Sequence, residues 1–140
     1  MKVGIYNHQH YRGGCPGCSQ TYVKGMISDA EKCKALVKRL YKEENLEFFN
    51  YTDLGDYPAD NVDRPGYKRL IADIEAGNLD AVIATNPTKI SNDINLIVDF
   101  YKTCKANKVH FLTSNEGKDI ETFLDILVKK QPKKEFGAIN

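Results

Sequence analysis

The sequence has no long hydrophobic run and no excess of charge of either sign. No apolar stretch approaches the roughly 18 residues that a membrane-spanning helix needs, so we expect no membrane segment. Lys and Arg number 20 and Asp and Glu number 19, which leaves a net charge of +1. This balance produces no strong positive field, so any DNA contact has to be local or lie in a part of the protein outside this sequence.

The first residues lack the features of a secretory signal, and cysteines are few. MKVGIY contains one Lys and then a strand-like stretch, without an apolar core or a small-residue cleavage site. We therefore expect a cytoplasmic protein, whose four cysteines need no disulfides. Cys33 and Cys104 fall at apolar positions of helical patterns, where a free thiol behaves as a small hydrophobic side chain.

The length of 140 residues suits a single domain, which we place at residues 1–130, followed by a basic tail at 131–140. Short apolar runs predict strands at KVGIY, LEFFNY, LDAVIA and VHFLTS. A capping box of Ser28 and Glu31 predicts a first helix over about 29–44. Pro65 and Gly77 bound a second helix over about 65–76. Apolar residues at helical spacing predict a third helix around 94–104 and a fourth around 120–128.

Strands that alternate with helices specify an α/β fold of three layers, α/β/α, with a mainly parallel sheet ordered two, one, three and four. LDAVIA is almost entirely apolar, which is typical of a central strand covered on both faces. Function in such sheets lies beyond the carboxyl ends of the strands. Three predicted loops meet that description, at residues 7–20, 52–64 and 85–92.

One stretch carries a specific family pattern. RPGYKRLIADIEAGNLDAVIA, residues 64–84, resembles the catalytic domain of the serine recombinases (resolvases and invertases), in which Arg-Pro-Gly begins a helix that ends in Glu-Ala-Gly before the central strand. MKVGIY, ISDAEKCKALVKRL, FFNYTDLGDY and TKISNDINLIVDFY resemble further segments in the family's order, over most of residues 1–128. The resemblance implies a resolvase-like fold, DNA as a partner and a homo-oligomeric state.

The resemblance also implies where an active site would lie after the first strand. The family has Tyr-x-Arg-x-Ser there, in which Ser attacks the DNA phosphate and Arg holds the phosphate oxygens. This chain keeps Tyr6, but His8 stands where Arg is expected and His10 stands where the nucleophile belongs.

After the central strand the family has Asp-Arg-Leu-Ser-Arg, and this chain reads TKISN. Thr88 replaces the acid, Lys89 replaces the first Arg and Asn92 replaces the second. Arg64 matches the remaining active-site Arg. It either clamps a phosphate or pairs with the acidic loop, whose carboxylates are Asp53, Asp56, Asp60 and Asp63.

Strand exchange needs a nucleophile and several guanidinium groups around one phosphate. We therefore expect a domain from a site-specific recombination context that lacks strand-exchange activity, serving in DNA-linked assembly or as the N-terminal part of a mobile-element recombinase or regulator. An active enzyme with a relocated nucleophile, Ser19 or Ser91, is an alternative. Another is attack by His10 itself.

A second interpretation concerns the loop after the first strand. His8, His10, Cys15 and Cys18 form H-x-H-x4-C-x2-C, four ligands that suit zinc. The same Cys-Pro-Gly-Cys could act as a redox thiol pair, but the predicted first helix begins some ten residues after Cys18, too far to lower a thiol pKa. The loop could also hold reduced, idle cysteines and two surface histidines. The expected cofactor is thus none or a zinc ion.

Overall fold

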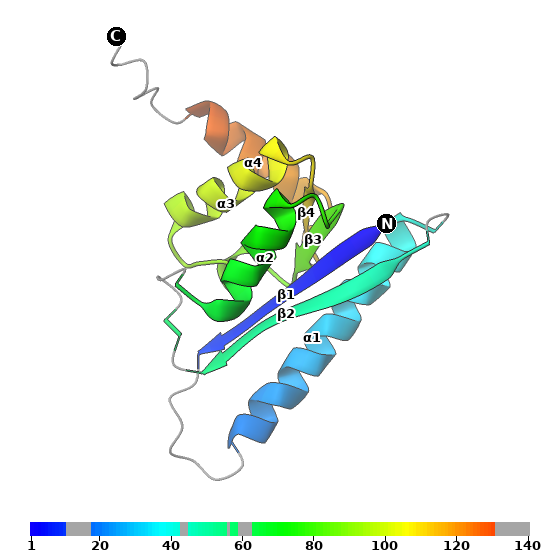
Figure 1. Ribbon diagram of the computed structural model, residues 1–140, viewed down its shortest axis with the longest axis vertical. Helices are drawn as coiled ribbons and strands as arrows, with labels where there is room; N and C mark the ends of the chain where they lie inside the picture. The colour runs from blue at the N-terminus through cyan, green and yellow to red at the C-terminus, as the bar shows by residue number, and fades with distance from the viewer. Residues whose placement is uncertain (11–17, 43–44, 56, 59–62, 131–140) are drawn as a thin grey trace.

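The computed structural model describes residues 1–10, 18–42, 45–55, 57–58 and 63–130 (Figure 1). Within these residues, four strands alternate with four helices and one short 3-10 helix. In chain order these elements are β1 (Lys2–His10), α1 (Cys18–Leu40), β2 (Glu47–Gly55), α2 (Pro65–Glu75), β3 (Ala81–Ala84), η1 (Pro87–Lys89), α3 (Ile94–Ala106), β4 (His110–Thr113) and α4 (Asp119–Lys130).

The four strands form one parallel sheet in the order β2-β1-β3-β4, which confirms the predicted fold class and strand order. β1 pairs with β2 along its whole length, from Lys2 opposite Glu47 to His10 opposite Gly55. β3 lies between β1 and β4, and its four residues are buried, as predicted for a central strand. The carboxyl ends of all strands therefore lie at one edge of the sheet.

Helices cover the two faces unequally (Figure 1). α2, α3 and α4 share one core cluster, which includes Leu70, Phe100 and Leu124. α1 covers the other face, where Cys33 and Val37 pack on the sheet. Side chains of a strand alternate between faces, so β1 contributes to both clusters.

The two cysteines predicted to be buried free thiols, Cys33 and Cys104, are both buried and free. Burial raises the pKa of the Cys33 thiol to about 12, and burial likewise raises the pKa of Cys104. Neither thiol is therefore ionised at neutral pH, in agreement with a packing role.

The first helix begins earlier than predicted. α1 starts at Cys18, so Ser28 lies inside the helix and does not cap it, and the predicted start near residue 29 is wrong. Val23, Met26 and Ala30 continue the helical spacing toward the N-terminus, and residues 18–40 contain no proline. The capping pattern at Ser28 involves only a few residues, whereas the apolar stripe of the helix extends further and determines where α1 begins.

The first two strands are longer than predicted. β1 continues through Asn7 and His8 to His10, and β2 continues through Asp53 to Gly55, both inside the loops that the sequence predicted. β1 and β2 remain paired up to His10 and Gly55, which satisfies the backbone groups on their facing edges. The polar residues at their ends therefore belong to strands and have fixed directions.

The second helix matches the prediction, and Gly77 ends it with a φ of 78°. At its other end Gly66 is placed so that a Cβ would lie 2.7 Å from the Thr52 carbonyl oxygen and 2.9 Å from Asp53 Oδ2. Only glycine lets the start of α2 approach β2 this closely.

We expect Gly66→Ala to destabilise the fold by about 1–3 kcal/mol, because the added methyl group has to push a backbone carbonyl aside. Gly25→Ala is the matched control: it lies exposed within α1 with nothing within 4 Å of the added Cβ. Here alanine should stabilise the helix by about 0.5–1 kcal/mol. Urea unfolding of both variants measures the two effects, and equal shifts would contradict the close approach.

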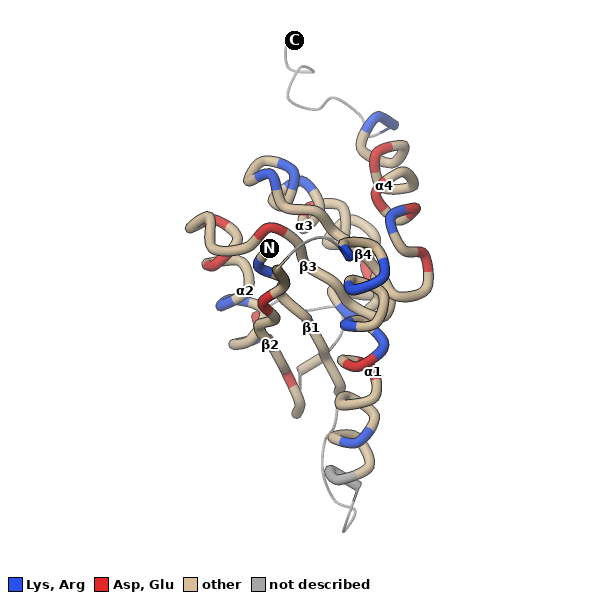
Figure 2. Tube along the Cα trace, turned by 90° about the vertical axis from the view of Figure 1, so that its right-hand side faces the viewer, with Lys and Arg blue, Asp and Glu red and all other residues tan. Residues whose placement is uncertain are grey.

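Among the described residues no helix has the length and apolarity to span a membrane. Both signs of charge are present along α1 and on α4, where acidic residues stand in the first turn and basic residues in the last turn (Figure 2). This mixing agrees with the near-zero net charge of the sequence.

Candidate functional site

Polar side chains from three strand ends meet at the carboxyl edge of the sheet. Tyr6 and His8 come from β1, and Asp53 comes from β2, where it lies directly opposite His8. Arg64 precedes α2, and Lys89 ends η1 after β3. The parallel sheet brings these residues together because all its strands end at the same edge.

Arg64 is turned into the protein. Its side chain is 1% exposed, and its Nη1 donates to the Tyr6 hydroxyl at 2.8 Å and to the Lys89 carbonyl at 3.2 Å. Nη2 donates to the Ile90 carbonyl. The guanidinium carbon lies 5.7 Å and 5.1 Å from the ring centres of Tyr6 and Tyr67. This cation joins the start of α2 to β1 and to the segment after β3.

Asp53 is the centre of the same network, and the sequence suggested it only as one member of an acidic loop. It is buried, and its Oδ2 accepts from the Tyr6 hydroxyl at 2.7 Å. The backbone N–H groups of Gly66 and Tyr67 also donate to its carboxylate, at 2.8 and 2.9 Å. A carboxylate suits the N-terminus of a helix, where N–H groups have no intrahelical partner.

Tyr6 connects the two charges. Its hydroxyl donates to Asp53 and accepts from Arg64. The pKa of Tyr6 is raised far above its ordinary value, mainly by burial and also by the hydrogen bond to Asp53. Tyr6 thus keeps its proton, and the predicted pairing of Arg64 with the acidic loop takes the form of an Arg64–Tyr6–Asp53 chain.

The other carboxylates of that predicted acidic loop differ from Asp53. Asp63 pairs with Lys68 on the surface. Asp56 and Asp60 lie outside the described residues.

His8 is buried, so its interpretation as a surface histidine in a loop is wrong. The reason is that β1 continues past Tyr6 and turns His8 toward the same face. Its Nε2 lies 2.5 Å from the Tyr57 carbonyl oxygen. Burial lowers the pKa of His8 below 6.5, although the hydrogen bond to Tyr57 opposes the shift. His8 is therefore neutral at neutral pH.

This lowered pKa predicts a pH dependence of stability. Below pH 6.5 an unfolded chain protonates His8 more readily than the folded protein does, so the free energy of unfolding falls as the pH falls from 6.5 through the folded pKa. We expect His8→Gln to flatten this part of the stability profile. Urea unfolding across acidic and neutral pH measures it, with the exposed His110→Gln as control. Parallel profiles for the wild type and His8→Gln would contradict the prediction.

Lys89 lies against the end of β1. Its Nζ donates to the His8 carbonyl at 3.1 Å and lies 4.0 Å from Asp29 Oδ2 of α1. Its side chain is mostly buried, with 19% exposure. Of the predicted site residues, the structure thus brings together His8, Arg64 and Lys89.

The remaining candidates are placed differently. His10 and Asn92 are exposed, at the end of β1 and between η1 and α3. Ser91 is fully buried, and its Oγ accepts from the backbone N–H of Asp93 at 3.0 Å. Such a hydroxyl has no open path to a phosphate. The side chain of Ser19 lies outside the described part of the structure.

The zinc hypothesis falls partly outside the described residues, because Cys15 and the side chain of Cys18 are not among them. Within the described residues no group of three or more His, Cys, Asp or Glu side chains is placed to hold a metal. His8 already uses Nε2 toward Tyr57, so a metal at His8 would need Nδ1 or the loss of that contact. Cys18 is the first residue of α1, which corrects the expectation that this helix begins far from it.

Comparison with known proteins gives a family match. The family described as "Resolvase, N terminal domain" matches residues 27–129. Among curated protein sequences none matches the chain.

Solved structures share the fold at low sequence identity. The N-terminal catalytic domain of TP901-1 integrase has a TM-score of 0.62 and 19% identity, over 92% of this chain and 95% of that one. A resolvase family site-specific recombinase from Streptococcus pneumoniae has a TM-score of 0.60 and 15% identity, over 92% and 86%. A serine recombinase from Sulfolobus solfataricus has a TM-score of 0.58 and 18% identity, over 91% and 81%. These likenesses establish the fold.

Proposed function

Since this chain belongs to the resolvase N-terminal domain family, we propose that it works in site-specific DNA recombination as an assembly domain without serine strand-exchange activity. In this role it would associate with DNA and with further copies of itself, and other subunits would supply the chemistry. The observation that carries the proposal is the position of Arg64, the one arginine that matches the family's active site. Its guanidinium is buried and hydrogen-bonded to the Tyr6 hydroxyl and the Lys89 carbonyl.

The chemistry of the edge supports inactivity. A phosphoryl transfer places negative charge on the phosphate oxygens, and cations stabilise it when they face the phosphate. Lys89 directs its ammonium toward a backbone carbonyl and Asp29. His8 is neutral and hydrogen-bonded to Tyr57. The edge therefore offers a phosphate few unengaged positive groups.

The position of the family nucleophile also supports inactivity. His10 stands there, exposed at the end of β1. An imidazole carries no hydroxyl, so it cannot form the serine phosphodiester linkage on which the family's reaction depends. Ser91, the nearby hydroxyl after β3, is fully buried.

A trapping experiment tests the proposal. The protein is incubated with a labelled pool of nicked duplexes of random sequence, which trap covalent intermediates, and the products are separated under denaturing conditions. We expect no protein–DNA adduct above that of His10→Ala. An adduct in the wild type that disappears in Ser19→Ala or Ser91→Ala would overturn the inactive assignment and identify the nucleophile.

Assembly is tested separately by sedimentation of the protein with and without duplex DNA. We expect a homo-oligomer and DNA association that weakens as salt rises, because phosphate contacts release counterions. A monomer that does not sediment with DNA at low salt would contradict the assembly role while leaving the trapping result unaffected.

A further inference from the structure

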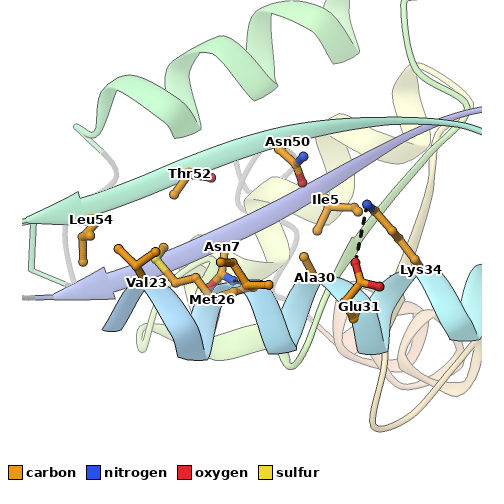
Figure 3. Close-up of a pocket in the computed structure, with 11 residues that line it drawn as sticks. Ile5, Asn7, Val23, Met26, Ala30, Glu31, Lys34, Asn50, Thr52 and Leu54 are labelled. Carbon is orange, nitrogen blue, oxygen red and sulfur yellow. Dashed lines mark hydrogen bonds and ion pairs between the residues drawn. The ribbon is translucent and has the colours of Figure 1, made fainter. Parts of the chain in front are cut away.

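A cavity of about 380 Å³ is lined by Ile5 and Asn7 of β1, which alternate with Tyr6 and His8 and so lie on the opposite face of the sheet from the Arg64 network. Figure 3 shows the residues that line this cavity. It opens between the N-terminal half of α1 and the ends of β1 and β2. Its apolar lining residues are Ile5, Val23, Met26, Ile27, Ala30 and Leu54. Its size falls within the range of roughly 300–1,000 Å³ that is typical of small-molecule sites.

The cavity exists because α1 packs on the sheet mainly through its C-terminal half. Cys33, Leu36 and Val37 belong to the core cluster of this face. Nearer the N-terminus of α1, Val23 and Ile27 are 42% and 59% exposed. Apolar side chains at the mouth of the cavity are thus left without a covering element among the described residues.

One wall carries a polar group without a hydrogen-bond partner. Asn7 of β1 is 6% exposed and lines the cavity. Its Nδ2 donates to the Met26 carbonyl at 3.2 Å, which fixes the amide, but its Oδ1 has no partner in the described part of the chain. A buried acceptor left unpaired costs free energy, and a donor that reaches it recovers that cost.

The charges at the cavity are already paired. Glu31 and Lys34 both line the cavity, one turn apart on α1. The Lys34 Nζ lies 3.6 Å from the Glu31 Oε2, so the two charges form an ion pair. Asn50 and Thr52, on the facing stretch of β2, add uncharged polar groups. The site therefore offers a ligand no net charge, which favours a neutral molecule over an anion or a cation.

We propose that this cavity binds a neutral, small apolar molecule that carries one N–H or O–H group, which donates to Asn7 Oδ1. The apolar body fills the space between Ile5, Met26 and Ala30, and displaces water from the exposed side chains at the mouth. The site is independent of the proposed role in recombination, because it uses the other face of β1.

Indole is a suitable probe, and 1-methylindole is its matched control without the donor. The chain contains no tryptophan, so the fluorescence of the probe is measured without an indole signal from the protein. We expect indole to bind roughly tenfold more tightly than 1-methylindole, the difference of one buried hydrogen bond. Asn7→Leu should bring the two affinities within about twofold of each other, because it removes the acceptor.

Filling the cavity provides a second test. Ala30→Leu adds volume from α1, and Thr52→Leu adds it from β2, so one variant serves if the other folds poorly. Either should abolish binding of both probes while thermal unfolding shows an intact fold. The proposal is overturned if neither probe binds the wild type, if both bind equally well, or if binding survives a filled cavity in a folded variant.

Discussion

Asp53→Ala destabilises the fold by about 3–5 kcal/mol, because it removes the carboxylate to which three buried donors are hydrogen-bonded. The Tyr6 hydroxyl and the backbone N–H groups of Gly66 and Tyr67 lose their partner. The same Tyr6 hydroxyl accepts from the Arg64 guanidinium, which is 1% exposed, so the substitution also disturbs the surroundings of a buried charge. Buried donors left without an acceptor are far more destabilising than the loss of an exposed ion pair.

Urea unfolding monitored by circular dichroism measures this loss. Asp63→Ala is the matched control, because it removes another aspartate of the same segment. Asp63 pairs with Lys68 on the surface, and both side chains are more than 60% exposed. We expect that control to change stability by less than about 0.5 kcal/mol. Asp53→Asn keeps the shape of the side chain and should fall between the two. Equal effects of Asp53→Ala and Asp63→Ala would show that the network does not stabilise the fold.

Phe100→Ala destabilises the protein by about 3–5 kcal/mol through the loss of a central aromatic side chain. Phe100 of α3 is 1% exposed and lies between two other rings. Its ring centre is 5.9 Å from that of Tyr67 on α2 and 5.2 Å from that of Phe111 on β4, the latter edge to face. Truncation therefore leaves a void where two helices and the sheet meet.

Phe123→Ala, on α4, provides the comparison, because that ring is 52% exposed. We expect Phe123→Ala to lower the free energy of unfolding by less than about 1 kcal/mol. Thermal and urea unfolding of the two variants measure the difference. If the two substitutions cost the same, the core on this face is not organised around Phe100.

The fold was predictable because its signals are periodic. LDAVIA and the apolar stripes of α2, α3 and α4 have the spacing of their elements, and Arg-Pro-Gly followed by Glu-Ala-Gly marks both ends of α2. The start of α1 was missed because a capping pattern at Ser28 is local, while the helix is extended by contacts of Met26 with the sheet. Tertiary packing decides such boundaries.

The site was only partly predictable, for a related reason. Arg64, His8 and Lys89 were placed by the resemblance, and the structure brings them together. Asp53 was missed as the key acceptor because its partners, Tyr6 and the N–H groups of α2, are distant in sequence or belong to the backbone. Asp53 lies directly opposite His8 in the paired strands, which would have indicated its role. That pairing could be predicted only if the extent of β1 and β2 were known.

The interior position of β1 has a consequence for how the chain acquires its structure. β1 precedes the other described elements along the chain, yet it pairs with β3, whose residues Ala81–Ala84 follow after α1, β2 and α2. During translation β1, α1 and β2 can assemble as a unit, but one edge of β1 remains unpaired until β3 leaves the ribosome. An exposed strand edge of this kind invites pairing with a neighbouring nascent chain. The period between the emergence of β2 and the emergence of β3 from the ribosome therefore leaves this edge of β1 open to such pairing.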